Sequence, residues 1–396
     1  CKAGRDVQVY EASPHAGGRC RSFYDEGLDA VIDNGAHLMM SGNTDIMAYL
    51  DIIGATQNVF ALDRAKFDFL DVQDGHKWSI DLGAKRGKLA LLAWMFDANR
   101  RPPAAGPLAL LKDVLALKAS KGKTVAECLD IHAAHFRSFW EPLCIGILNA
   151  NPQEAAAELL WAVFEETVLL GGHAAKPLLT KNGLGDALVE PALAVLKKSG
   201  TKVQFGQRVQ AIEVQGGRVT SLKFSQGIQV VKPHDLVVLA VPHFVVGTLI
   251  EGLSPPENTH AILNVHYRLD EEHETGLKGL VGSPVQWVFT RGHIASVTMS
   301  AADDWISKDS AFIAKTLWPD VVRVLGLKTS DVPAFRVIKE RRATFAQSPE
   351  SLALRANPET ALENLILAGD WTNTGLPATI EGAVRSGRKA AQAVLA

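Results

Sequence analysis

The segment VQVYEASPHAGGRC at residues 7–20 constrains the fold more than any other part of this sequence. VQVY is a short run of β-branched and aromatic residues that predicts a strand, and Glu11 stands at its end. An acidic residue at the end of the second strand of a βαβ unit holds the adenosine ribose in dinucleotide-binding folds. Gly17 and Gly18 let main-chain N–H groups approach a phosphate, and Arg19 adds a charged donor. The segment therefore indicates a dinucleotide site, with a simple surface turn as the alternative.

The first half of such a site is not found ahead of Glu11. The fold begins with a strand and a G-x-G-x-x-G turn, and the acidic residue lies about 20 residues past the glycines. Only ten residues precede Glu11, they contain no such turn, and the first of them is Cys1 rather than Met. We therefore expect an N-terminally incomplete chain, from which the strand and the glycine loop, about 20–30 residues, are missing. This leaves open whether the chain alone binds a cofactor.

Composition excludes several classes of protein. The chain has 396 residues, 47% hydrophobic and 21% charged, with a formal net charge of −2, which gives no reason to expect a nucleic-acid partner. The four cysteines show no C-x-x-C spacing, so we expect no metal site, no disulfide framework and a cytoplasmic location. No uninterrupted apolar run reaches the roughly 18 residues of a membrane span.

The order of the predicted elements indicates a discontinuous domain. Strand-forming pieces of α/β character stand at the start, in the middle and at the end of the chain, separated by two blocks of different character. We predict an α/β fold with α+β insertions, in which a Rossmann-like nucleotide-binding domain is built from residues 1–58, 180–250 and 355–396. Residues 59–179 and 251–354 would form a substrate-binding domain with a helical part.

The C-terminal segment carries a second candidate motif. LILAGD predicts a buried strand that ends at Gly369 and Asp370, and the loop WTNTGLPA leads to a helix from about Thr379. A carboxylate in this position can hold a polyol hydroxyl. The helix N-terminus can stabilise an anionic reduced flavin at its N1–C2=O edge. The alternative is a capped surface helix with Asp370 in a turn.

Together these motifs resemble those of the FAD-dependent amine oxidase and phytoene desaturase superfamily. The middle segment, GLGDALVEPALAVLKKSG with VQFGQRVQAIEV, resembles a stretch in which the main chain at Val209 would lie against the adenine. More closely, AGGRCRSFYDEGLDAVIDNGAHLMMSGN and GDWTNTGLPATIEGAVRSG resemble the bacterial hydroxysqualene dehydroxylase family, flavoproteins of squalene and hopanoid biosynthesis. The resemblance runs from residue 1 to 396. It implies FAD as cofactor, with contacts from Glu11, Gly17, Gly18, Arg19, Val209, Gly369, Asp370, Ala378, Thr379 and Ile380.

The resemblance also implies a reaction, the reductive removal of the allylic hydroxyl of hydroxysqualene. This chemistry needs a hydride from reduced flavin, a proton donor for the leaving hydroxide and a dry channel for a C30 isoprenoid. His37 and Asp33 are the candidate catalytic residues, with a structural histidine and a turn-forming aspartate as alternatives. His266 and Tyr267 in NVHYRLD are candidates for substrate contacts, although a strand residue faces either side with equal chance.

The implied partner is a long-chain isoprenoid, and no NAD(P)H motif identifies the electron donor. Residues 86–118 combine apolar helical stretches, Trp94 and Phe96 with arginines and lysines, which suits peripheral contact with the inner face of the cytoplasmic membrane. A helical insertion that merely covers the core is the alternative. Two rival functions stay open: a carotenoid desaturase or amine oxidase of the same superfamily, and a non-catalytic lipid-binding protein that lacks FAD.

Overall fold

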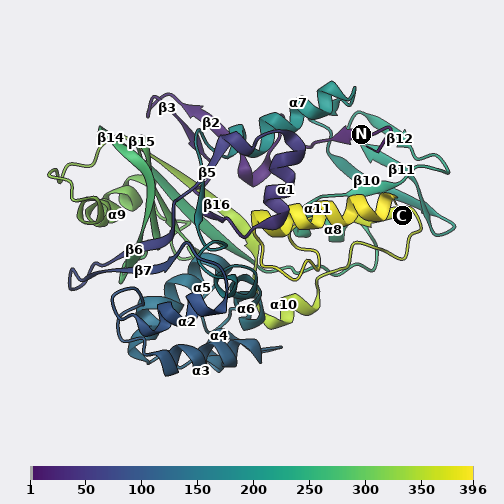
Figure 1. Cartoon of the computed structure of the whole chain (residues 1–396). Coiled ribbons are helices and arrows are strands. Elements are labelled where there is room, and N and C mark those ends of the chain that lie inside the picture. Colours follow the sequence, from purple (N-terminus) through teal and green to yellow (C-terminus); the bar gives the residue numbers. More distant parts are fainter. Residues whose placement is uncertain (1–2, 396) are drawn as a thin grey trace.

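The computed structural model describes residues 3–395 and has three parts (Figure 1). A helical lobe with α2 to α6 lies at one end, and a sheet containing the long strands β14 and β15 adjoins it. The third part, here called the terminal part, contains both chain ends and the long C-terminal helix α11 (Ile380–Leu395). The sequence motifs of interest lie mainly in the terminal part.

Two short parallel strand pairs join distant segments in the terminal part. β1 (Val9–Tyr10) pairs with β9 (Val203–Gln204), which connects the N-terminal and middle segments. β13 (Val237–Leu239) pairs with β17 (Leu365–Leu367), which connects the middle and C-terminal segments. These pairings agree with an α/β arrangement assembled from separated segments, while the domain boundaries themselves stay a prediction.

Three further helices and a three-stranded sheet belong to this part. The helix α1 (Thr44–Ile53) ends at Gly54, whose φ of 69° is the left-handed conformation that glycine adopts at low cost. It packs against α11, and Ile46 and Leu50 are buried. The other elements are α7 (Glu190–Lys198), α8 (His243–Leu249), and the antiparallel strands β10 (Val209–Gln215), β11 (Arg218–Phe224) and β12 (Gly227–Val230).

The central sheet is dominated by one strand of 23 residues, β14 (Thr259–Val281). It pairs antiparallel with β15 and β16 and parallel with β6. The apolar helix α9 (Ser310–Leu325) packs on the sheet, where the rings of Tyr267 and Trp318 lie 4.9 Å apart. The remaining strands of this sheet are β6 (Ala65–Asp71), β7 (Lys77–Gly83), β15 (Trp287–Met299) and β16 (Phe335–Phe345).

The helical lobe has its own apolar core. Trp140, Leu117 and Leu160 are buried at its centre. Its elements are α2 (Lys88–Phe96), α3 (Pro107–Lys118), α4 (Val125–Cys128), a π-helical turn (Phe136–Trp140), α5 (Glu141–Leu148) and α6 (Ala157–Glu166). Within residues 3–395, no helix combines the length and apolar character that a membrane crossing requires.

Short elements connect these parts. The strands are β2 (Ser22–Asp25), β3 (Ala30–Asp33), β4 (Met39–Met40), β5 (Val59–Ala61) and β8 (Pro177–Thr180), and α10 (Pro349–Ala353) precedes β17. Single 3₁₀ turns occupy Gly18–Cys20, Thr56–Asn58 and Val168–Leu170, and a π-helical turn, Gly185–Val189, leads into α7.

Candidate functional site

The N-terminal and C-terminal motifs meet in a direct ion pair. Arg19 Nη2 lies 2.9 Å from Asp370 Oδ2, and Arg19 Nη1 donates to the carbonyl of Ala343. The Asp370 side chain is 8% exposed, whereas 42% of the Arg19 side chain is accessible. Burial lowers the pKa of Arg19, but the Asp370 carboxylate outweighs this effect and raises it. The arginine is therefore held firmly at one end and still has surface for a ligand.

The two glycines before Arg19 form a tight turn. Gly17 and Gly18 have φ values of 101° and 53°, in the left-handed region that favours glycine. A Cβ on Gly17 would lie 3.0 Å from Val189 Cγ2, so this residue also needs to be small. Gly18 has open space where a Cβ would stand. The turn thus brings main chain close to the segment before α7 and leaves one side free.

Glu11 and Val209 lie at the same edge of the terminal part. The carbonyl of Glu11 accepts from the N–H of Gln207, two residues before Val209. Tyr10 stacks on Phe224, the pairing partner of Val209, with ring centroids 4.7 Å apart. The Glu11 carboxylate accepts from the N–H of Ser13 at 2.6 Å, and its second oxygen has no acceptor role in the described chain. The structure therefore brings these two predicted contacts together.

Gly369 permits the close turn that precedes Asp370. Its φ is +137°, and a Cβ there would lie 2.6 Å from Trp371 Nε1. Trp371 is fully buried and donates through Nε1 to the carbonyl of Val241, two residues after β13 ends. Ser386 Oγ, from α11, accepts from the Gly369 N–H at 2.8 Å. Strand, loop and helix are thereby fixed to one another around the Asp370 carboxylate.

The start of α11 presents free hydrogen-bond donors. Ala378 N–H donates to Gln347 Oε1, and Gly382 N–H donates to the Thr379 hydroxyl. The N–H groups of Thr379, Ile380 and Glu381 have no acceptor among residues 3–395. Helix N-termini carry such unsatisfied donors together with a partial positive charge, which favours an anion or a polarised carbonyl. The predicted contacts Thr379 and Ile380 lie at this helix start, and their contact with a flavin stays a prediction.

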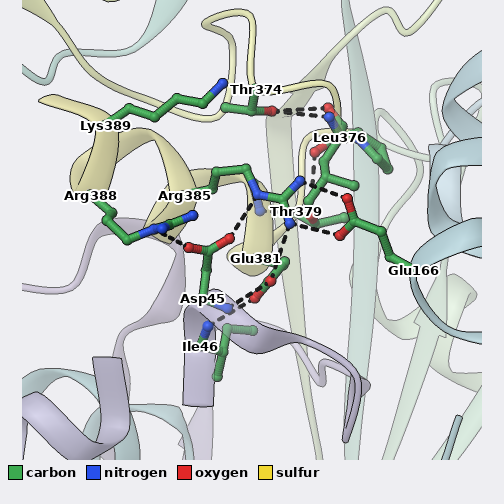
Figure 2. A network of polar contacts seen from close by, with 12 residues as sticks. Asp45, Ile46, Glu166, Thr374, Leu376, Thr379, Glu381, Arg385, Arg388 and Lys389 are labelled. Carbon is green, nitrogen blue, oxygen red and sulfur yellow. Dashed lines mark hydrogen bonds and ion pairs between the residues drawn. The ribbon is translucent and has the colours of Figure 1, made fainter. Parts of the chain in front are cut away.

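Glu381 uses its side chain to hold α1 rather than to line the site. Its carboxylate accepts from the N–H groups of Asp45, at 2.9 Å, and Ile46, at 2.8 Å, so it caps the N-terminus of α1 (Figure 2). Burial raises the pKa of Glu381, although these two amide hydrogen bonds favour the ionised form. The cap aligns α1 with the first turn of α11.

Arg385, one turn further along α11, connects three helices (Figure 2). It donates to Asp45 at 2.7 Å and forms a two-pronged pair with Glu166 at 2.8 and 2.7 Å. The hydrogen bond to Glu166 is the main reason that its pKa is raised. Glu166 ends α6, so this contact also attaches the helical lobe. Sequence reasoning missed it, and the only local signal is the Glu381–Arg385 spacing of four residues.

Asp33, a predicted catalytic residue, is buried and fully engaged. Its Oδ1 accepts from Ser22 Oγ at 2.5 Å and from the N–H of Leu184 at 2.8 Å. Its Oδ2 lies 3.1 Å from Arg291 Nη1 on β15. This carboxylate joins the terminal part to the central sheet, so its position favours an anchoring role over that of a free acid or of a turn former.

His37 lies in the loop between β3 and β4. Burial lowers the pKa of His37, with the Asp33 carboxylate acting in the opposite direction, and the residue keeps exposed surface. That surface is open to a ligand, and the catalytic role of His37 stays a prediction.

The two substrate candidates on β14 face opposite sides of the sheet. His266 is buried, bonds Ser296 Oγ through Nδ1 at 2.7 Å, and has no partner for Nε2 in the described chain. Burial lowers its pKa to about 4, while Asp33 acts to raise it, so this ring lies toward the Asp33 side. Tyr267 instead donates to the carbonyl of Ala314 on α9. The structure argues against a substrate contact for Tyr267, because strand neighbours alternate and this one is in the α9 core.

His243, at the start of α8, is a site residue that sequence reasoning missed. It is 4% exposed, its Nε2 lacks a partner among residues 3–395, and burial lowers its pKa to about 4. The charges of Asp370 and Arg19 act on it in opposite directions. Its position directly after the strand LVVLAVP was the available signal, since ligands in α/β folds bind at the carboxyl ends of strands.

Comparison with known proteins places this geometry in a family. Residues 1–395 match the pattern of the flavin-containing amine oxidoreductases. The chain belongs to this family. Family membership confirms the predicted flavin cofactor and oxidoreductase class, and it agrees with the α/β fold predicted from the sequence.

Curated relatives refine this assignment. A hydroxysqualene dehydroxylase of Rhodopseudomonas palustris is 40% identical over 100% of this chain and 94% of its own length. One from Sinorhizobium fredii is 38% identical over 99% and 93% of the two chains. A probable zeta-carotene desaturase of Synechococcus elongatus is more distant, at 21% identity over 99% and 94%. The predicted family resemblance is thereby confirmed.

Solved structures confirm the fold. Cyclohexylamine oxidase from Brevibacterium oxydans superposes with a TM-score of 0.73 at 15% identity, over 99% of this chain and 94% of the other. A putrescine oxidase superposes with a TM-score of 0.69, also at 15% identity, over 100% and 95%. At this identity the likeness concerns architecture alone.

Proposed function

We propose that this protein is an FAD-dependent oxidoreductase of squalene biosynthesis that converts hydroxysqualene to squalene and water. Relatives that are 36–40% identical over nearly their whole length carry the name hydroxysqualene dehydroxylase. The observation that carries the proposal is the Arg19–Asp370 ion pair, because it unites the two motifs on which the resemblance rests. The substrate would be a long-chain isoprenoid with an allylic hydroxyl.

The described residues fit a flavin. Arg19 retains accessible surface beside Asp370, and the N–H groups of Thr379, Ile380 and Glu381 have no acceptor among residues 3–395. Asp370 would hold a polyol hydroxyl of FAD, Glu11 a ribose hydroxyl, and the first turn of α11 the polar edge of the ring. Reduced flavin supplies the hydride that replaces the hydroxyl, while the protein supplies position and electrostatics.

The main chemical task of the side chains is to supply the proton for the leaving hydroxide. His37 is our candidate donor, because it keeps exposed surface and the Asp33 carboxylate acts on its charge. Its lowered pKa makes the neutral imidazole the main form at neutral pH, so protonation becomes easier in mildly acidic buffer. His266 stays neutral over the same range and is suited to hydrogen bonding with the substrate hydroxyl.

The test is anaerobic conversion of hydroxysqualene by the full-length protein with FAD and dithionite. In the balanced reaction, the substrate gains a hydride at the carbinol carbon and loses hydroxide, which leaves as water with one added proton. Squalene should form stoichiometrically with the electrons consumed. Phytoene and a primary amine are tested with oxidised flavin in parallel. Turnover of either without squalene formation would establish the desaturase or amine oxidase alternative.

Peripheral membrane contact is the finer part of the proposal. The helices α2 and α3 leave several large apolar side chains uncovered, among them Phe96 at 73% and Leu108 at 83% exposure. Leu92, Leu111 and Leu115 extend this surface, here called the α2–α3 face. Leu108, Leu111 and Leu115 have the spacing of one helix face.

Charge favours an anionic bilayer as the occupant of this face. Residues 85–123 contain nine lysines and arginines against two aspartates, in a chain with a net charge of −2. One of the aspartates, Asp113, is buried and bound to His135 and Trp140. Apolar side chains surrounded by cations are typical of interfacial helices, and a substrate dissolved in lipid would reach the protein there.

A further inference from the structure

Arg355 lies beside the loop that joins β17 to α11, and within residues 3–395 its side chain hydrogen-bonds only to that loop. It follows the short helix α10 and is 7% exposed. Its acceptors are four main-chain carbonyls and one hydroxyl: Leu376 O at 2.8 Å, Asp370 O at 3.0 Å, Thr372 O at 2.5 Å, Trp371 O at 3.4 Å and Thr374 Oγ1 at 2.9 Å. One guanidinium therefore determines the path of residues 370–376.

In the described part of the chain, the Arg355 guanidinium has no carboxylate partner. Within residues 3–395, no aspartate or glutamate oxygen lies within ion-pair distance of Arg355. Burial lowers its pKa to about 10, with Asp370 acting in the opposite direction, so it remains charged at neutral pH. An unpaired buried charge is costly unless dipoles solvate it, and the loop carbonyls provide that solvation here. The loop and the charge depend on each other.

The location of the loop gives this arrangement a consequence for the flavin. The loop begins with Asp370, which pairs with Arg19, and continues to the free N–H groups at the start of α11. Thr374 also accepts from the N–H of Leu376, which tightens the same turn (Figure 2). A loop released from Arg355 would lose the fixed orientation of both the carboxylate and the helix N-terminus.

We propose that Arg355 is a positioning residue of the flavin site, which fixes the loop 370–376 and adds positive potential that favours the anionic reduced flavin. The cofactor in this inference rests on the proposed function, but the fixing of the loop does not. Lysine at position 355 would retain the charge and lose the planar fork of five donors, whereas methionine would lose both. The two variants therefore separate positioning from electrostatics.

Hydrogen exchange measured by mass spectrometry on the full-length protein without FAD tests the positioning. In R355K and R355M, amides of residues 369–379 should exchange at least about tenfold faster than in the wild type, because the loop opens more often. The matched control is R137M, which removes an arginine bound to Asp71 and Gln73 in another part of the molecule. It should leave exchange in 369–379 unchanged.

FAD titration and the flavin midpoint potential test the effect of Arg355 on the bound cofactor. Both variants should bind FAD at least about tenfold more weakly, and the potential should be more negative in R355M than in R355K. Wild-type exchange and wild-type affinity in R355K would overturn the proposal, and this variant decides alone if R355M does not fold. If the wild type did not turn over hydroxysqualene, the proposed function would be wrong, but the exchange, affinity and potential measurements would still test the role of Arg355.

Discussion

Two arginine-centred contacts join the N-terminal segment to the C-terminal segment, and they differ in how much of the arginine is used. Arg385 binds Asp45 and Glu166 and keeps only 13% of its side chain accessible. Arg19 binds Asp370 and keeps 42% accessible. The first contact, here called the closed contact, is saturated. The second, the open contact, has donor surface left over.

The difference in accessible side chain distinguishes the contact that is part of the structural framework from the contact that is part of the flavin site. A saturated buried pair stabilises the arrangement of helices and has nothing to offer to a ligand. An arginine that is fixed by one buried carboxylate and still accessible is ready to bind an anionic group. Both contacts depend on the same helix, since Arg385 lies in α11 and Asp370 stands at the start of the loop that leads to it. The framework thus sets the geometry of the site.

The largest expected effect is on stability, through the closed contact. R385M leaves Glu166 and the capping Glu381 without their cation and leaves the buried Asp45 with Arg388 alone, so it should lower the free energy of unfolding by about 3 kcal/mol. Chemical denaturation measures this. The matched control is R218M, which breaks the exposed pair with Glu363 and should cost less than about 1 kcal/mol. Equal losses in the two variants would contradict the assignment of Arg385 to the framework.

The next effect concerns the open contact and appears in cofactor affinity. D370N removes the negative charge that fixes Arg19 and replaces one of the two carboxylate acceptors with an NH2 donor, so the charged acceptor for the flavin polyol is lost. Two charge-assisted hydrogen bonds are lost, so FAD should bind about 100-fold more weakly. Absorbance titration near 450 nm measures the affinity. D51N on the exposed side of α1 serves as control, and a D370N protein with the affinity of this control would remove Asp370 from the site.

A smaller effect links the open contact to pH. His243, beside this contact, has a pKa of about 4 in the folded protein, below the ordinary value of 6.5. The unfolded chain therefore binds the proton first as the pH falls, and stability is lost from about pH 6.5 toward pH 4, by at most about 1.4 kcal/mol per pH unit. H243Q should flatten this part of the profile of unfolding free energy against pH. H132Q, at an exposed position, should not, and parallel profiles for H243Q and the wild type would refute the link.

The smallest effect on the fold is expected from the α2–α3 face, which contributes to neither contact. The double variant L108E/L115E should lower binding to vesicles that contain anionic lipid at least about threefold, because it replaces apolar contacts with negative charge. Unfolding free energy and FAD affinity should stay at the wild-type values. I228E, an exposed apolar position on β12, is the matched control. Vesicle binding unchanged by L108E/L115E and lowered by I228E would assign the membrane contact elsewhere.

Much of the fold could be predicted from local sequence. Apolar residues at helical spacing over residues 44–54, followed by Gly54, predict a helix that the structure has as α1, and the pattern over 309–326 predicts the helix α9. Caps and apolar periodicity act within a few residues, so they can be read from the chain. The pattern over 124–150 also predicts a helical stretch, but the structure has α4, a π-helical turn and α5 there. Packing of the Phe136–Trp140 segment in the lobe core overrides its periodicity there.

The site was predictable only in part, for a physical reason. Glu11, Arg19 and Asp370 belong to motifs whose spacing has a chemical meaning, and the structure brings the last two into contact. Arg355, Arg385 and His243 act through partners that are distant in the chain or lie in loops, and no periodicity reports such contacts. The substrate contact predicted for Tyr267 is disfavoured for a similar reason. A strand with apolar residues on both faces does not show in its sequence which face meets the substrate.

The central claim is that Arg19 and Asp370 act as one unit in the flavin site. A double-mutant cycle of R19M, D370N and R19M/D370N, with FAD dissociation constants measured by titration of the full-length protein, tests it most directly. We expect non-additive effects, in which the double variant binds FAD about as weakly as D370N alone and the coupling free energy exceeds about 1 kcal/mol. Additive effects, or single variants that bind FAD as the wild type does, would contradict it.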